Sequence, residues 1–263
     1  MSGLSILFIG DIVGRPGRRA ARENIDKLSR VEDFDLIIAN AENGAGGFGL
    51  TGEVIEELLG YGIDVITTGN HVWDKKDIIE YIENSDRVLR PLNYPPGNPG
   101  RGFGLFTGRS GFNYLVVNLS GRVFMGNYDC PFRAVDTLLE NIGGKCRFKI
   151  IDIHAEATSE KEAIGYYLDG RVSAVLGTHT HVQTGDERIL PEGTGYITDA
   201  GMCGPQNSII GMKKEHILRR FLSQMPVKFE VATGPVLFSA VILEFDDNTG
   251  MCRKIRRVYE KSD

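Results

Sequence analysis

The chain has 263 residues, of which 41% are hydrophobic and 25% charged, a composition that is typical of a globular protein and excludes disorder throughout. The formal net charge of −5 argues against a large nucleic acid as partner but leaves a small nucleotide open. No apolar run approaches the ~18 residues of a membrane span, and the four cysteines form no CxxC pair, so we expect a cytoplasmic protein with reduced thiols.

In the first half of the chain, short β-rich runs alternate with amphipathic segments. We expect strands at residues 4–9, 34–39 and 63–67. The first of these segments is interpreted as a strand and not as a signal peptide. We expect helices at residues 16–29, 51–59 and 74–82, with Thr51 and Asp74 as N-caps.

The second half begins with a long loop rich in proline and glycine at residues 91–102. A hairpin of strands 103–107 and 112–119 is expected next. Further strands are predicted at 148–153, 172–176 and 196–198, helices at 131–141, 159–168 and 213–223, and a closing antiparallel set at 227–231, 236–245 and 251–258. This order indicates a mixed α/β fold with helices outside, in one domain spanning residues 1–263.

Residues of the types that bind metals follow five of the predicted strands. They are Asp11, then Glu42 and Asn43, then Asn70 and His71, then His154, and finally His179 and His181. Ligands of open α/β sheets bind just beyond the carboxyl ends of the strands, so these residues are expected to converge on one site. Four of the five histidines lie at these points, and the fifth, His216, lies in a polar helix. The joint pattern predicts a metal site.

The donor types narrow the choice of metal. Carboxylate, amide oxygen and imidazole without cysteine favour iron, manganese or zinc. The candidates exceed the four ligands of a structural zinc, and they suit two ions, with Glu42 as a bridge. Two neighbouring ions form the usual clamp for displacement at phosphorus. Residues 10–17 lack the spacing of a phosphate-binding loop, and no GxSxG elbow is present.

The order of these motifs resembles that of the calcineurin-like metallophosphoesterases, on Gly69-Asn70-His71 and Gly177-Thr178-His179-Thr180-His181 above all. The first motif, Gly10-Asp11, lacks the usual histidine, and Glu42 replaces the usual aspartate. With both departures, the motifs resemble those of the bacterial YmdB-type phosphodiesterases. The sequences at residues 7–17, 40–43, 68–74, 90–95 and 152–161 resemble this family as well. The resemblance runs from about residue 4 to residue 258.

This resemblance implies a four-layer α-β-β-α sandwich with two mixed β-sheets and two metal ions, iron first and manganese next. It implies hydrolysis of 2′,3′-cyclic nucleotides, such as 2′,3′-cAMP, to 3′-nucleotides through a metal-activated hydroxide. Carried over by position, one ion would be held by Asp11, Glu42, Asn43 and His181, and the other by Glu42, Asn70, His154 and His179. His71 would be the catalytic acid–base residue.

Other interpretations stay open at this point. The chain could be a metal-dependent phosphomonoesterase, another nucleotide phosphodiesterase, or a non-catalytic regulator that senses a nucleotide through its metal site. His71, placed for proton transfer beside a ligand, favours an enzyme. The substrate-binding residues are unassigned, although the loops at 90–102 and 201–211, with Asn93, Tyr94 and Phe132, are candidates for a base pocket. A homo-oligomer is neither indicated nor excluded.

Overall fold

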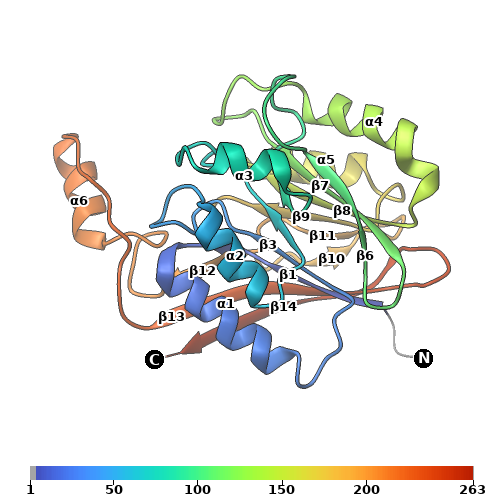
Figure 1. Cartoon of the computed structure of the whole chain (residues 1–263), viewed down its shortest axis with the longest axis horizontal. Coiled ribbons are helices and arrows are strands. Elements are labelled where there is room, and N and C mark those ends of the chain that lie inside the picture. The colour runs from blue at the N-terminus through green and yellow to red at the C-terminus, as the bar shows by residue number, and fades with distance from the viewer. Residues whose placement is uncertain (1–3, 263) are drawn as a thin grey trace.

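Two β-sheets face each other in the computed structural model, which describes residues 4–262 (Figure 1). The first sheet has the strand order β2-β12-β13-β1-β3-β4-β5, with β14 paired to β13. Its strands are β1 (Leu4–Ile9), β2 (Asp11–Ile12), β3 (Leu36–Asn40), β4 (Val65–Thr67), β5 (Val88–Leu89), β12 (Met202–Pro205), β13 (Val236–Phe245) and β14 (Cys252–Ser262). Strands β1, β3, β4 and β5 run parallel, and β13 is antiparallel to both β1 and β14.

The second sheet has the order β10-β11-β9-β8-β7-β6. Its strands are β6 (Phe103–Thr107), β7 (Asn113–Ser120), β8 (Phe148–His154), β9 (Ala174–Thr178), β10 (Arg188–Ile189) and β11 (Gly195–Ile197). The four central strands are parallel, whereas β6 and β10 pair antiparallel at the two edges. Both sheets are therefore mixed, and the predicted hairpin is confirmed.

Alternate residues of each strand face different cores, which produces the layers. In β1, Ile6 and Phe8 pack between the sheets, while Leu7 and Ile9 face the outer helices α1 (Gly14–Leu28), α2 (Gly52–Gly60) and α3 (Ile78–Asn84). The outer face of the second sheet is covered by α4 (Pro131–Ile142) and α5 (Thr158–Tyr167). This confirms the four-layer sandwich predicted from the sequence.

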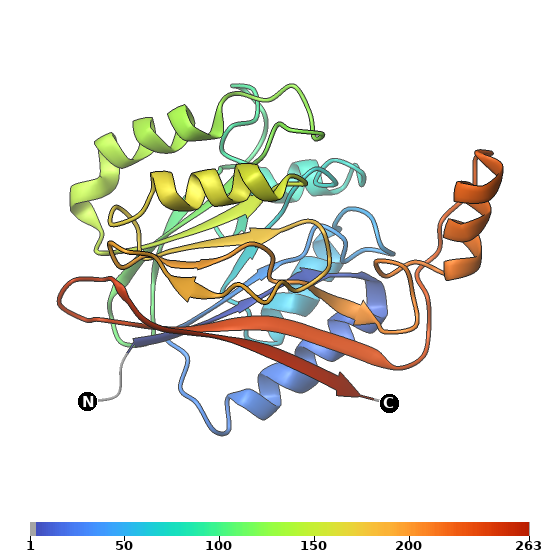
Figure 2. The same ribbon diagram turned by 180° about the vertical axis from the view of Figure 1, so that it is seen from behind.

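A sixth helix, α6 (Lys214–Ser223), projects from the body of the molecule (Figures 1 and 2), and a 3₁₀ turn, Gly143–Lys145, follows α4. Within residues 4–262, no helix is long and apolar enough to cross a membrane.

Three local predictions differ from the structure. Residues 227–231 form no strand, because only Val231 pairs, through one isolated bridge to Met212. The short strands β2, β5, β10 and β12 were not predicted, since two to four residues carry too little alternation. Asp74 does not cap a helix: α3 begins at Ile78, and the Asp74 carboxylate contacts His71 instead. Thr51 is an N-cap as predicted, accepting from the Val54 amide at 3.4 Å.

The carboxyl ends of the two sheets meet at one edge. Asn40 ends β3, and its side-chain amide donates to the Thr68 carbonyl after β4 and to the Asp152 carboxylate of β8, both at 3.2 Å. On the second sheet, His154 and Thr178 are paired at the ends of β8 and β9. Segments that follow strands of both sheets are thereby brought to a common place.

Candidate metal centre

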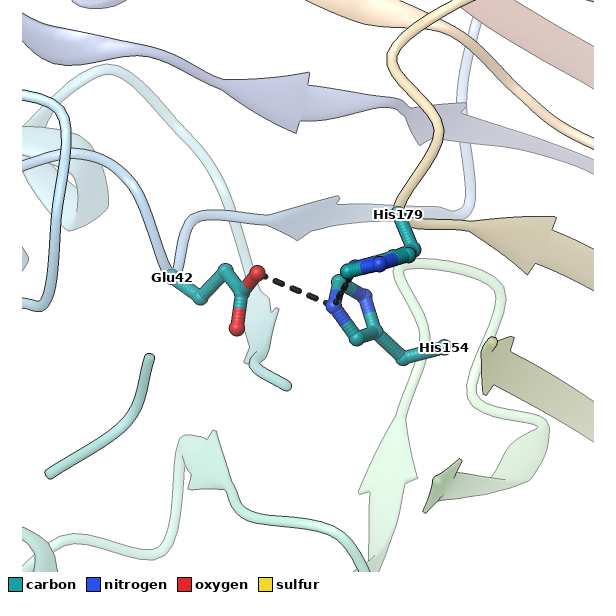
Figure 3. Close-up of side chains that lie close together, drawn as sticks. All are labelled: Glu42, His154 and His179. Carbon is teal, nitrogen blue, oxygen red and sulfur yellow. Dashed lines mark hydrogen bonds and ion pairs between the residues drawn. The ribbon is translucent and has the colours of Figure 1, made fainter. Parts of the chain in front are cut away.

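Three donor atoms from separate segments surround the Nε2 atom of His154. Oε1 of Glu42 lies 2.9 Å from it, Nδ1 of His179 3.0 Å, and Oδ1 of Asn70 3.1 Å. Figure 3 shows Glu42 and His179 approaching the His154 ring from different sides. Glu42 and His154 are buried, and with His179 they offer three ligand atoms that all lie within 4.8 Å of one another.

A second group of donors adjoins the first at Glu42. Nε2 of His181 lies 3.2 Å from Nδ2 of Asn43 and 3.7 Å from Oδ1 of Asp11. The same Asn43 nitrogen lies 3.4 Å from Oε1 of Glu42. A 180° rotation of the Asn43 side-chain amide exchanges its nitrogen and oxygen, and so places Oδ1, the atom that can bind a cation, where Nδ2 now lies. The structure thus brings together all seven residues predicted as ligands, in two groups that share Glu42.

The chemistry of these atoms fits bound cations. Oδ1 of Asp11 is buried without any hydrogen-bond partner among the described residues, which is rare for a carboxylate oxygen. Nε2 of His154 carries at most one hydrogen, yet the Glu42 and Asn70 oxygens, both acceptors, and a His179 nitrogen all point at it. Acceptor lone pairs that converge in this way are satisfied together by a positive ion.

The electrostatics of the cluster follow from its burial. Burial would raise the pKa of Glu42, but the charge and hydrogen bond of His154 outweigh it and lower the pKa to about 2. Burial and the positive His154 lower the pKa of His179 to about 3. Burial would lower the pKa of His154, but Glu42 and Asp11 raise it to about 9. Glu42 is therefore anionic and His179 neutral, the forms that bind metals, and a cation bound at Nε2 of His154 would take the place of a proton.

The His154 ring is held by two buried neighbours. Its Nδ1 donates to Oγ1 of Thr178 at 2.9 Å, and the Thr178 hydroxyl donates to Oδ1 of Asp152 at 2.7 Å. These two hydrogen bonds fix the His154 tautomer that leaves Nε2 available as a metal ligand. Gly69 lies against the same ring, where an added Cβ would come within 2.2 Å of Cδ2 of His154. Only glycine fits at this position.

The segment that carries His179 and His181 has an unusual backbone. Both residues have positive φ, 104° and 65°, a conformation that costs about 1–3 kcal/mol for a residue other than glycine. Asp199 holds the segment, accepting from the Thr180 amide at 3.0 Å and from its hydroxyl at 2.8 Å. The carboxylate of Asp199 is itself neutralised by the fully buried Lys161, at 2.7 Å.

We expect Asp199→Asn to lower the free energy of unfolding by about 3–5 kcal/mol, because it leaves the buried Lys161 ammonium without its counter-charge. The segment around Thr180 loses its charged acceptor as well, so bound metal should fall together with stability. Urea unfolding and metal analysis of the same preparation measure both effects. Asp186→Asn is the control, since its partner Arg188 is partly exposed. Equal stability losses in the two variants would contradict this role of Asp199.

His71 lies beside the ligand groups, but its ring forms no hydrogen bond or ion pair with any of them. Its backbone amide donates to Oε2 of Glu42 at 2.9 Å, while its ring packs edge-on against Phe48 and contacts Oδ2 of Asp74 through Nδ1 at 2.8 Å. The partly exposed ring lines a cavity of about 340 Å³ next to the donor cluster. The Asp74 contact leaves Nε2 of His71 free for a molecule in that cavity.

Apolar side chains that the sequence reasoning missed complete the cavity: Phe48, Met212, Ile217 and Phe229. Of the loop residues named as candidates for a base pocket, Ile210 lines this cavity, whereas Asn93, Tyr94 and Phe132 do not. Asn93 instead ties the Ser120 and Asp129 backbones, Tyr94 donates to the Gly69 carbonyl, and Phe132 packs on Tyr167.

Two polar residues of the site were also missed. Oε2 of Glu156 lies 3.1 Å from Nε2 of His179, and Asp74 contacts His71. Glu156 comes two residues after His154 at the end of a strand, so the strand-end pattern could have indicated it. The sequence around Asp74 predicts a helix cap, so it gives no indication of the contact between Asp74 and His71. Lys161 and Asp199 carry no such signal.

The fold and this cluster together define a metallophosphoesterase. A model of the YmdB-like protein family matches residues 7–258, and the chain belongs to this family, as the sequence motifs predicted. Membership identifies it as an enzyme that hydrolyses phosphate esters.

Relatives cover nearly the whole chain. A Bacillus subtilis protein named 2′,3′-cyclic-nucleotide 2′-phosphodiesterase is 46% identical over 99% of this chain and 98% of its own length. A Mycoplasma genitalium protein named as a putative phosphatase/phosphodiesterase is 36% identical over 98% and 93%. Among solved structures, a hypothetical protein from Thermus thermophilus has a TM-score of 0.93 at 45% identity, covering 99% of this chain and 100% of its own. A novel phosphatase from Mycoplasma pneumoniae has a TM-score of 0.94 at 35% identity, covering 100% and 95%.

Proposed function

We propose that this chain hydrolyses 2′,3′-cyclic nucleotides, such as 2′,3′-cAMP, to 3′-nucleotides with two metal ions, iron or manganese. The observation that carries the proposal is the pair of donor groups that share Glu42, whose Oε1 lies 2.9 Å from Nε2 of His154 and 3.4 Å from Nδ2 of Asn43. The name of the Bacillus subtilis relative supports the substrate class.

We assign the ligands by these groups. One ion would be held by Asp11, Asn43 and His181, the other by Asn70, His154 and His179, and Glu42 would contact both. When bound, such a pair neutralises phosphate oxygens and activates a water molecule as nucleophile.

The chain's own residues supply the remaining chemistry. His71 presents its free Nε2 to the cavity, where it would donate a proton to the 2′-oxygen that leaves phosphorus. Asp74 holds the opposite nitrogen of the ring at 2.8 Å and so sets its direction. The apolar wall around Phe48 and Phe229 offers a place for the nucleobase.

A substrate panel tests the proposal. Protein loaded with Mn²⁺ or Fe²⁺ is assayed with 2′,3′-cAMP, 3′,5′-cAMP, 3′-AMP and p-nitrophenyl phosphate, and products are separated by chromatography. We expect 2′,3′-cAMP to give the highest kcat/KM and 3′-AMP as product. Preference for 3′-AMP or p-nitrophenyl phosphate would indicate a phosphomonoesterase instead. Tight nucleotide binding without any turnover would indicate a regulator.

Asp74→Asn tests the orientation of His71. We expect kcat to fall by roughly 10- to 100-fold with metal content unchanged, because the amide can hold the ring in the wrong tautomer while the ligands stay in place. Steady-state kinetics with metal analysis on one sample checks both. The neighbouring Asp77→Asn, on the residue before α3, serves as control and should keep full activity. An Asp74→Asn enzyme with normal kcat would contradict this role.

A further inference from the structure

A second, larger cavity of about 810 Å³ adjoins the one at the metal centre. Phe229 lines both cavities, and the consecutive residues Gly46 and Gly47 line one each. Gly46 has a φ of 71° and an added Cβ there would meet no atom within 4 Å, so this part of the lining is bare backbone. The two cavities are therefore neighbours across a thin wall.

Positive side chains gather at the second cavity although the whole chain has a net charge of −5. They are Arg15, Arg19 and Arg22 of α1, together with Lys228. The two carboxylates that line this cavity have other partners: Glu57 is paired with Arg18 at 2.9 Å and Glu230 with Lys213 at 2.6 Å. Of the four positive side chains, Arg19 lies 3.9 Å from Glu23. Among residues 4–262, no carboxylate lies within 4.0 Å of the Arg15 guanidinium or the Lys228 ammonium. Both charges are exposed and free to meet an anion.

Aromatic rings accompany these charges. Tyr61 lies in the cavity with the Arg22 guanidinium 5.6 Å above its ring, and Phe229 stands between the two cavities. Cations that alternate with aromatic rings are the usual surface for a single-stranded nucleic acid, because the cations meet phosphates and the rings stack on bases.

The proposed reaction sets the direction in which a longer substrate extends. A 2′,3′-cyclic phosphate uses both the 2′- and the 3′-oxygen, so further nucleotides can be attached only at the 5′-oxygen, through an anionic phosphodiester. Building on the proposed function, we propose that the second cavity binds the one or two nucleotides on the 5′ side of a short RNA whose terminal 2′,3′-cyclic phosphate lies at the metal centre. The acidic remainder of the chain limits the contact to a short segment.

The test compares a trinucleotide that ends in adenosine 2′,3′-cyclic phosphate with 2′,3′-cAMP itself. We expect kcat/KM at low salt to be at least about tenfold higher for the trinucleotide. Raising monovalent salt from 50 to 200 mM should reduce this advantage roughly sevenfold if two phosphates are contacted. The double variant Arg15→Gln/Lys228→Gln should remove most of the advantage and leave 2′,3′-cAMP hydrolysis unchanged.

A matched control and a binding measurement separate the possible results. Arg30→Gln/Lys76→Gln removes two exposed charges that lie outside both cavities and should keep the advantage. Fluorescence anisotropy with a 5′-labelled trinucleotide 3′-phosphate should show about tenfold weaker binding for Arg15→Gln/Lys228→Gln than for the unaltered protein. The control variant should bind as the unaltered protein does. Turnover of 2′,3′-cAMP without a trinucleotide advantage, or an advantage that survives in this variant, would overturn the inference but keep the proposed function. Absence of 2′,3′-cAMP turnover would overturn the proposed function itself.

Discussion

Replacing His71 by alanine should lower kcat for 2′,3′-cAMP by roughly 10²–10⁴-fold while the protein keeps its metal. The ring of His71 lines the cavity and contacts Asp74, and it forms no hydrogen bond or ion pair with a proposed ligand. Only its backbone amide reaches the cluster, through Glu42 at 2.9 Å, and alanine retains that amide. The substitution therefore removes the proposed proton donor and leaves all the proposed metal ligands in place.

Steady-state kinetics and metal analysis on one preparation check this result. His216→Ala is the matched control, because this fifth histidine lies on the projecting helix α6 and should leave kcat unchanged. A substrate whose leaving oxygen needs no proton, such as a p-nitrophenyl phosphodiester, should be hydrolysed by His71→Ala with a much smaller loss. If His71→Ala lost its metal, His71 would have to be a ligand and its proposed catalytic role would be wrong.

Glu42→Gln should have the second large effect: loss of metal from both donor groups and a fall in kcat of more than about 100-fold. Both carboxylate oxygens are engaged, Oε1 near His154 and Asn43, and Oε2 on the His71 amide. Glutamine keeps the length of the side chain but offers a single oxygen and no charge.

Metal equivalents per chain, measured after dialysis against a weak chelator, check this prediction. Glu156→Gln is the control: its carboxylate also contacts the cluster, through His179 at 3.1 Å, but it is half exposed and belongs to neither ligand group. It should retain its metal. A Glu42→Gln protein that holds as much metal as the unaltered chain would show that Glu42 does not bridge.

The place of each candidate ligand could be predicted because it follows a strand. Short apolar runs mark β3, β8 and β9, and the residue types at their ends are unusual enough to stand out. What lies around the ligands could not be predicted in the same way. Lys161 and Asp199 meet across 38 residues of chain, and a single lysine on a helix is ordinarily an exposed residue.

The errors in the fold have a related cause. Residues 227–231 alternate like a strand, but no neighbouring strand pairs with them beyond the single bridge of Val231. Strands β2 and β12 are too short to show a pattern, yet their pairing brings Asp11 into register with Met202 at the edge of the first sheet. Whether these segments form strands depends on pairing with distant segments, and a local sequence pattern carries no information about that pairing. The extent of one domain over residues 1–263 and the choice of iron or manganese stay predictions.

Metal content per chain tests the central claim most directly. The protein is purified without oxygen and without an affinity tag, and its iron, manganese and zinc are measured against protein concentration, before and after reconstitution. The account predicts two equivalents per chain in the unaltered protein and fewer than one in Glu42→Gln. One equivalent or none that persists after reconstitution would contradict the binuclear centre.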